Sequence, residues 1–95
     1  MSRIRWSKKA NDQFMAAYDF LAAENPSAAE RQSNAILLAV HQLADFPEMG
    51  RIGRVSHTRE LVITGTAYIV VYRYRGNIVR ILALLHGSRR WPTHF

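Results

Sequence analysis

Two β-like runs joined by a short turn decide the fold of this chain: AYIVVYRY at residues 67–74, RGN at 75–77 and IVRILALL at 78–85. Valine, isoleucine and tyrosine dominate these runs, and such residues favour β-strands. The Gly76-Asn77 pair between them favours a tight two-residue hairpin. We therefore predict an antiparallel pair of strands in the last third of the sequence.

The turn also predicts which residues of the hairpin face each other. Pairing of Arg75 with Ile78 places Arg73 opposite Arg80, and side chains then alternate between the two faces of the sheet. The aliphatic residues expected on the face of Arg73 and Arg80 are Ile69, Val71, Leu82 and Leu84. The other face is expected to pack on helices, and it carries Tyr68, Val70, Tyr72, Tyr74, Val79, Ile81, Ala83 and Leu85.

The last third of the chain carries positive charge and no acidic residue. From Leu61 to the C-terminus there is no Asp or Glu, whereas the arginines are Arg73, Arg75, Arg80, Arg89 and Arg90. Like charges opposite each other destabilise a sheet, unless both side chains splay into water. Two helices can cover only one face of the sheet, and an open apolar face rimmed by charge is typical of an interface. We expect an acidic partner to cover this face.

The rest of the chain predicts a strand, two helices and a further strand before the hairpin. Residues 4–6 form a short strand, and Ser7 caps a helix that ends near Asn25. A second helix, capped by Asn25, starts at Pro26 and runs to Phe46, followed by a loop over 47–58 and a strand over 59–64. The predicted fold class is α+β, with the order β-α-α-β-β-β and a helical hairpin on one face of a mainly antiparallel sheet, in a single domain over 1–95.

Composition limits the function classes. The net charge of +6 and the sequence pI of about 10.5 suit nucleic acid or an acidic protein as partner. There is no cysteine, no signal-peptide core and no apolar run long enough to span a membrane, so we expect a cytoplasmic location. The histidines are scattered without carboxylate spacing, and neither a metal site nor a cofactor is predicted.

Ordered motifs along nearly the whole chain resemble the RelE/ParE superfamily of bacterial toxins, and the ParE branch more than the RelE branch. They include Trp6 before a polar helix start, NPSAA at residues 25–29, FPEMGR at 46–51, TRELV at 58–62, YIVVYR at 68–73 and HGSRRWP at 86–92. No single motif is specific, but the ordered set is. The resemblance implies an acidic antitoxin as partner. It also implies inhibition of DNA gyrase for ParE-like toxins, or cleavage of mRNA on the ribosome for RelE-like ones.

Cleavage of RNA needs a proton acceptor, a cation at the phosphate and an acid for the leaving oxygen. Arginine stays protonated, so Arg51, Arg54 and Arg59 could hold a phosphate but not act as bases. His86 is the plausible acid or base, and its alternative is local hydrogen bonding. Arg59-Glu60 could equally be a surface charge pair. If the protein is a ribonuclease, the catalytic candidates are Arg59 and His86.

We therefore predict a toxin that acts by binding, with two contact surfaces. The predicted antitoxin-binding residues are Ile69, Val71, Arg73, Arg80, Leu82 and Leu84. The predicted target-binding residues are Arg59, Arg89, Arg90 and Trp91. Trp91 has an alternative, which is a tail that folds back beside the sheet. The alternative functions are an mRNA endonuclease and a nucleic-acid-binding domain without toxicity.

Overall fold

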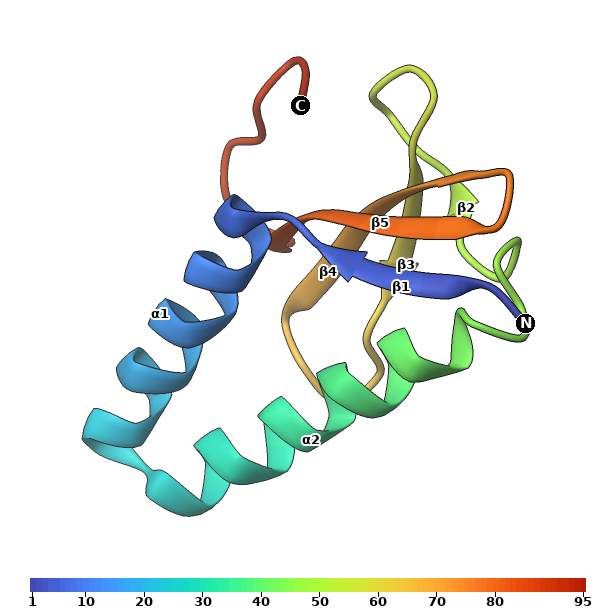
Figure 1. Cartoon of the computed structure of the whole chain (residues 1–95). Helices are drawn as coiled ribbons and strands as arrows, with labels where there is room; N and C mark the ends of the chain where they lie inside the picture. Colours follow the sequence, from blue (N-terminus) through green and yellow to red (C-terminus); the bar gives the residue numbers. More distant parts are fainter.

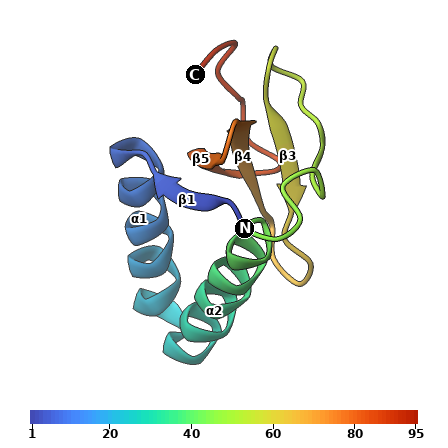
Figure 2. The same cartoon turned by 45° about the vertical axis from the view of Figure 1, so that its right-hand side comes forward.

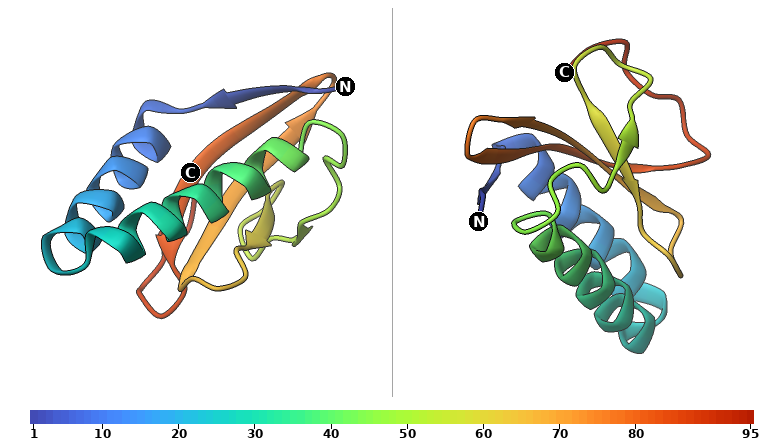
Figure 3. Two further views of the ribbon diagram at one scale, coloured as in Figure 1. Left: turned by 90° about the horizontal axis from the view of Figure 1, so that it is seen from below. Right: turned by 90° about the vertical axis from the view of Figure 1, so that its right-hand side faces the viewer.

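The computed structural model describes all residues from 1 to 95, and it combines two helices with a five-stranded sheet. The elements in chain order are β1 (Arg3–Trp6), α1 (Lys8–Glu24), α2 (Pro26–Gln42), β2 (Arg51–Ile52), β3 (Arg59–Val62), β4 (Tyr68–Arg75) and β5 (Ile78–His86). The sheet order is β1-β5-β4-β3-β2, and only the β1–β5 pair is parallel. The helical hairpin lies on one side of the sheet (Figures 1 and 3). The predicted α+β fold is confirmed, with the two-residue strand β2 as an addition.

Side-chain caps start both helices as predicted. The hydroxyl of Ser7 accepts a hydrogen bond from the Ala10 N–H, and the Asn25 side chain accepts one from the Ala28 N–H. Each cap satisfies an N–H that the first turn of a helix leaves without a partner. The second helix ends at Gln42 rather than at Phe46, because residues 43–45 continue as tight turns that bond three residues back.

The core lies between the helical hairpin and one face of the sheet. Its eleven buried residues are Ala10, Ile36, Val40, Leu43, Leu61, Ile63, Val70, Tyr72, Val79, Ile81 and Leu84. Trp6 and Phe14 close one end of this core with their rings in edge-to-face contact. Neither helix has the length and hydropathy that a membrane crossing requires.

A β-bulge changes the predicted register of the hairpin halfway along β5. The pairs next to the turn are those predicted, including Arg73 with Arg80. Leu82 is then an extra residue, so Val71 pairs with Ala83 and Val70 pairs with Leu84. One inserted residue moves every later side chain to the opposite face. The prediction that Leu84 lies on the arginine face is therefore wrong, since Leu84 packs in the core against the helices.

The prediction of an open apolar face is wrong as well, because the protein's own chain covers its centre. Val71 and Ala83 are fully buried, and Ile69 is 8% exposed. The loop between β2 and β3 and the C-terminal tail lie side by side on the side of the sheet away from α2 (Figures 1 and 2). Gly87, where the tail begins, donates its N–H to the Ala67 carbonyl and lies close to the Ile69 side chain. Near the β4–β5 turn this face exposes arginines and Ile78, and on β3 it exposes Val62 opposite Ile69.

Candidate functional site

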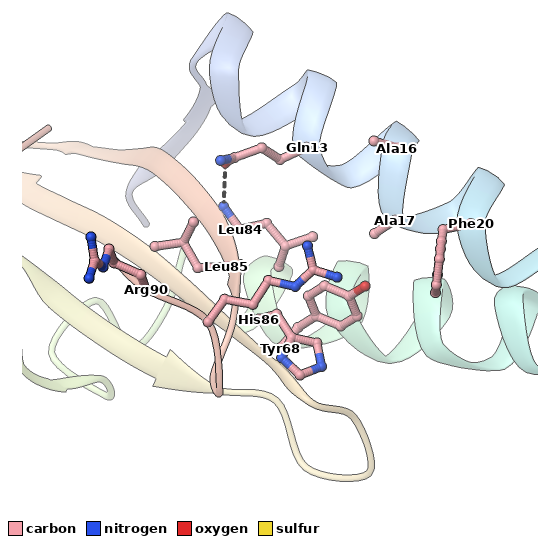
Figure 4. A pocket seen from close by; sticks show the side chains of 10 residues that line it. Gln13, Ala16, Ala17, Phe20, Tyr68, Leu84, Leu85, His86 and Arg90 are labelled. Carbon is pink, nitrogen blue, oxygen red and sulfur yellow. Dashed lines mark hydrogen bonds between the residues drawn. The ribbon is translucent and has the colours of Figure 1, made fainter. Parts of the chain in front are cut away.

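A groove runs between helix α1 and the end of the sheet where β5 finishes (Figure 4). It has a volume of about 370 Å³ and is lined by Gln13, Ala16, Ala17, Phe20, Tyr68, Leu84, Leu85, His86, Arg89 and Arg90. A second hollow of about 510 Å³ shares Phe20, Tyr68 and His86 with it and extends to the turn at residues 65–67. The two hollows therefore form one continuous depression along the helical hairpin, which we call the hairpin groove.

The hairpin groove is mainly apolar, and all its formal charge is positive. Phe20 is 64% exposed on its wall, although phenylalanine is a residue that folding normally buries. Arg89 and Arg90 stand at its rim, and no Asp or Glu lines either hollow. This combination of an exposed aromatic ring and a basic rim suits an amphipathic segment that carries carboxylates.

The bulge at Leu82 gives the groove a distinctive backbone edge. Strand β1 pairs with β5 only as far as Ile81, so the later part of β5 has no neighbouring strand on that side. The Ser7 hydroxyl donates to the Leu82 carbonyl, and the Gln13 side chain accepts from the Leu84 N–H at 2.9 Å (Figure 4). Side chains of the α1 region thus replace part of the missing strand, which keeps the groove wall in place.

The two residues predicted for RNA cleavage are not brought together. Arg59 pairs with Tyr72, and His86 pairs with Tyr68, two strands away and four residues along β4. Strand spacing of about 4.8 Å and a rise of about 3.4 Å per residue place them roughly 16 Å apart. The side chains of both residues also form hydrogen bonds within the protein. The Arg59 guanidinium donates to the Gly50 and Glu48 carbonyls, whereas His86 Nδ1 lies 2.8 Å from the Ser88 hydroxyl.

Glu60 is the centre of a buried ion-pair cluster rather than half of a surface pair with Arg59. One of its carboxylate oxygens bonds the Arg51 guanidinium, and the other bonds the Arg54 N–H and guanidinium. Burial alone would raise the pKa of the Glu60 carboxyl. The hydrogen bonds from the Arg54 backbone and from both guanidinium groups outweigh burial and hold the pKa below its ordinary value. Arg51 and Arg54 therefore bind the Glu60 carboxylate in this structure, and each keeps about half of its side chain exposed.

The C-terminal tail folds back, which is the alternative predicted for Trp91. The Trp91 ring stacks on the Arg54 guanidinium at 3.5 Å, and its Nε1–H donates to the His86 carbonyl. Trp91 is half-buried by these contacts, whereas Arg89 and Arg90 remain exposed. Of the residues predicted for target contact, the two tail arginines alone have exposed side chains without an ion-pair partner.

The arginines on the face of the sheet away from the helices form one cluster near the β4–β5 turn. Arg5 pairs with Arg80 across β1 and β5, and Arg80 pairs with Arg73 across β5 and β4. Arg3 and Arg75 lie two residues further toward the turn, both paired with Ile78. We call the set of Arg3, Arg5, Arg73, Arg75 and Arg80 the arginine face. The sequence predicted only the Arg73–Arg80 pair, because the parallel position of β1 is set by tertiary packing.

The hairpin groove was not predicted, although the sequence holds one signal for it. Phe20 lies outside the apolar stripe of the first helix, and a large aromatic residue there has no core to enter. No group of three or more metal-ligating side chains gathers anywhere in the structure.

Comparison with known proteins assigns the chain to a class of toxins. Residues 4–91 match the model of the family described as "ParE toxin of type II toxin-antitoxin system, parDE". The protein Y4kP of Sinorhizobium fredii, named as a candidate toxin, is 38% identical over 90 residues, which cover 95% of this chain and 93% of Y4kP. The toxin RelE2 of Caulobacter vibrioides is 29% identical over 89 residues, which cover 94% of this chain and 99% of that protein.

The fold is shared with a solved structure of the same kind. A chain of the chromosomal ParDE toxin–antitoxin system from P. aeruginosa superimposes with a TM-score of 0.79 at 24% identity, covering 88% of this chain and 94% of that one. The fold and the family match together define the toxin component of a type II toxin–antitoxin system. The chain belongs to the ParE toxin family, and an antitoxin partner follows from that membership.

Proposed function

We propose that this toxin stops growth by binding DNA gyrase in the cytoplasm and not by cutting RNA. The observation that carries the proposal is the placement of Arg59 and His86, roughly 16 Å apart by strand geometry. Each of them is engaged by its own chain, at Gly50 and at Ser88. A general acid and a phosphate-binding cation must reach the same phosphodiester group. Membership in the ParE family supports the same choice.

The hairpin groove is our proposed antitoxin site. An acidic, amphipathic segment of the antitoxin would place apolar side chains against Phe20 and Tyr68 and carboxylates beside Arg89 and Arg90. Such a segment folds as it binds, and its affinity depends on a few buried anchors. The predicted contact between antitoxin carboxylates and Arg73 with Arg80 stays a prediction. Its apolar part is withdrawn for Ile69 and Val71, which are buried, and for Leu84, which faces the helices. A contact with Leu82, half-buried at the bulge, stays a prediction.

Arg89 and Arg90 are also our proposed contact with gyrase, with Trp91 as the residue that positions them. The stacking of Trp91 on Arg54 holds the tail against the sheet, so the two arginines project from the groove rim. An antitoxin in the groove would then cover the arginines that the target needs. Neutralisation would follow from this overlap.

The second candidate function is ribosome-dependent mRNA cleavage, which the name of the Caulobacter relative favours. His86→Ala separates the two functions, because His86 is the candidate acid or base of such a nuclease. The variant is expressed without antitoxin, and growth arrest is followed. Binding to gyrase predicts that arrest persists. Loss of both arrest and mRNA cleavage in this variant would establish the nuclease.

The antitoxin site is tested by Phe20→Asp, measured as the Kd for the purified antitoxin. Truncation of a central aromatic anchor weakens binding by about 2 kcal/mol or more, roughly thirtyfold. Phe46→Asp is the matched control, because Phe46 is also 64% exposed but does not line the groove. Equal losses in the two variants would remove the groove from the interface.

A further inference from the structure

The arginine face combines a high density of positive charge with a complete lack of counter-charge. In the register of the sheet, Arg5, Arg80 and Arg73 form one row across three neighbouring strands, with Arg3 and Arg75 on either side of Ile78 in the next row. Residues that pair directly across strands share a face, so all five side chains emerge on the side away from the helices. Four are exposed, and Arg73 is half-buried.

No carboxylate neutralises this face. The acidic side chains that form ion pairs are Glu60, with Arg51 and Arg54, and Asp12, with Lys8. The one hydrogen bond recorded for a guanidinium of the face joins Arg73 to the backbone carbonyl of His57. Like charges on neighbouring strands destabilise a sheet, so a set of five is retained at a cost to stability. Such a cost is understandable if an anion binds between the side chains.

The shape of the surface suits phosphate groups. A hollow of about 260 Å³ is walled by Arg73, Arg75 and Arg80, with Ile78 at its side. A second hollow of about 340 Å³ lies across the edge of β4 and shares Arg73 and Arg75 with the first, adding His57 and Tyr74. Planar guanidinium groups bind phosphate oxygens with two parallel hydrogen bonds, which makes arginine the preferred residue for such contacts.

We propose that the arginine face binds the phosphate backbone of a nucleic acid. An acidic peptide would need several apolar anchors as well as charge, and the central aliphatic residues of this face are covered, with Val71 fully buried and Ile69 8% exposed. Among the five arginines the exposed apolar side chain is Ile78, at 37%, and Val62 is exposed on β3 outside this cluster. A phosphate backbone needs only closely spaced cations. The proposal does not depend on the gyrase or the antitoxin assignment. The face lies near the start of β5 and the groove near its end, and Arg80 and His86 are six residues apart, about 20 Å of strand.

The test is fluorescence anisotropy of the purified toxin with a labelled 20-base-pair DNA duplex and a labelled single-stranded RNA, each titrated at several salt concentrations. The test variant is R73Q/R75Q/R80Q. The control variant K8Q/K9Q/R31Q removes the same charge from α1 and α2, where all three side chains are exposed. A third variant, R73K/R75K/R80K, keeps the charge and reports whether the sheet tolerates substitution here.

We expect the test variant to bind nucleic acid roughly tenfold or more weakly at low salt. Its slope of log affinity against log salt should fall by about 2–3 units, whereas the control and the lysine variant keep most of theirs. Preference for duplex or for single strand identifies the physiological source of the phosphates. Equal losses in test and control variants would overturn the proposal, because binding would then reflect net charge alone. Loss of antitoxin affinity in the test variant with unchanged nucleic-acid affinity would assign the face to the acidic protein instead.

Discussion

Replacing Glu60 with glutamine is expected to lower the free energy of unfolding. The Glu60 carboxylate links Arg51 and Arg54 to β3 on the face of the sheet away from the helices. The carboxylate accepts four hydrogen bonds, from Arg51 Nε and Nη2 and from Arg54 N and Nε, at 2.8 to 3.2 Å. Glutamine keeps the volume but not the charge, and it turns one acceptor into an N–H₂ donor. That donor would face either the donors of Arg51 or those of Arg54.

The expected loss of stability in E60Q depends on how exposed Glu60 and its two arginine partners are. Hydrogen bonds to a charged group contribute about 1.5–3 kcal/mol each, and removing one partner of a buried ion pair costs about 3–5 kcal/mol. Glu60 is 3% exposed, but the arginine side chains are 54% and 48% exposed and can turn toward water. We therefore expect the free energy of unfolding to fall by about 2–3 kcal/mol, or roughly 10–20 °C in Tm for a domain of this size.

The pH dependence of this loss provides a second check. The folded-state pKa of Glu60 lies below its ordinary value of 4.5, so its contribution to stability is present above that value. The contribution disappears as the pH falls through the lowered pKa, because the folded and unfolded carboxyl groups are then both protonated. The difference in stability between the wild-type protein and E60Q should thus be constant near neutral pH and shrink at acidic pH.

Urea denaturation of both proteins from pH 7 downward measures this difference directly. Asp12→Asn is the control, since Asp12 forms an exposed pair with Lys8 and should cost less than about 0.5 kcal/mol. A loss below 0.5 kcal/mol in E60Q, or a gap that does not change with pH, would refute the role assigned to the cluster.

Three further changes test the packing of the same region. Tyr72→Phe removes a buried hydroxyl that accepts from the Gly50 N–H and donates to the Pro47 carbonyl, so unfolding by urea should show a loss of about 1–3 kcal/mol. Gly53→Ala places a Cβ 2.2 Å from the Thr58 hydroxyl oxygen and 2.9 Å from the Thr58 carbonyl oxygen, and Tm should fall in line with about 1–3 kcal/mol of overpacking. Trp91→Ala removes the stack on Arg54, so hydrogen exchange at residues 87–91 should accelerate while the amides of β4 keep their protection.

Local chemistry made part of the fold predictable. The helix caps at Ser7 and Asn25 and the hairpin register next to Gly76-Asn77 depend on residues close in sequence, and the structure confirms them. The bulge at Leu82 could not be predicted, because an extra residue leaves the apolar pattern of the strand unchanged. That single residue explains why Leu84 is in the core.

The parts of the site that sequence reasoning missed depend on where loops and tails lie. Glu60 follows Arg59 directly, and the pattern suggested a surface pair, but Arg51 and Arg54 approach Glu60 through the loop after β2. The β2–β3 loop and the C-terminal tail cover Val71, and the hydrophobic periodicity of the sequence does not indicate the path of either segment. Side-chain type still predicted the nature of the contacts, since the acid-free last third does present a basic surface.

Whether the toxin acts on gyrase or on mRNA is decided by comparing two activities of one toxin preparation. DNA supercoiling by gyrase and protein synthesis in a purified translation system are each titrated with the wild-type toxin, with and without antitoxin. We predict that supercoiling is inhibited, that added antitoxin restores it, and that mRNA on the ribosomes stays intact. Cleavage of that mRNA together with unimpaired supercoiling would show that gyrase is not the target.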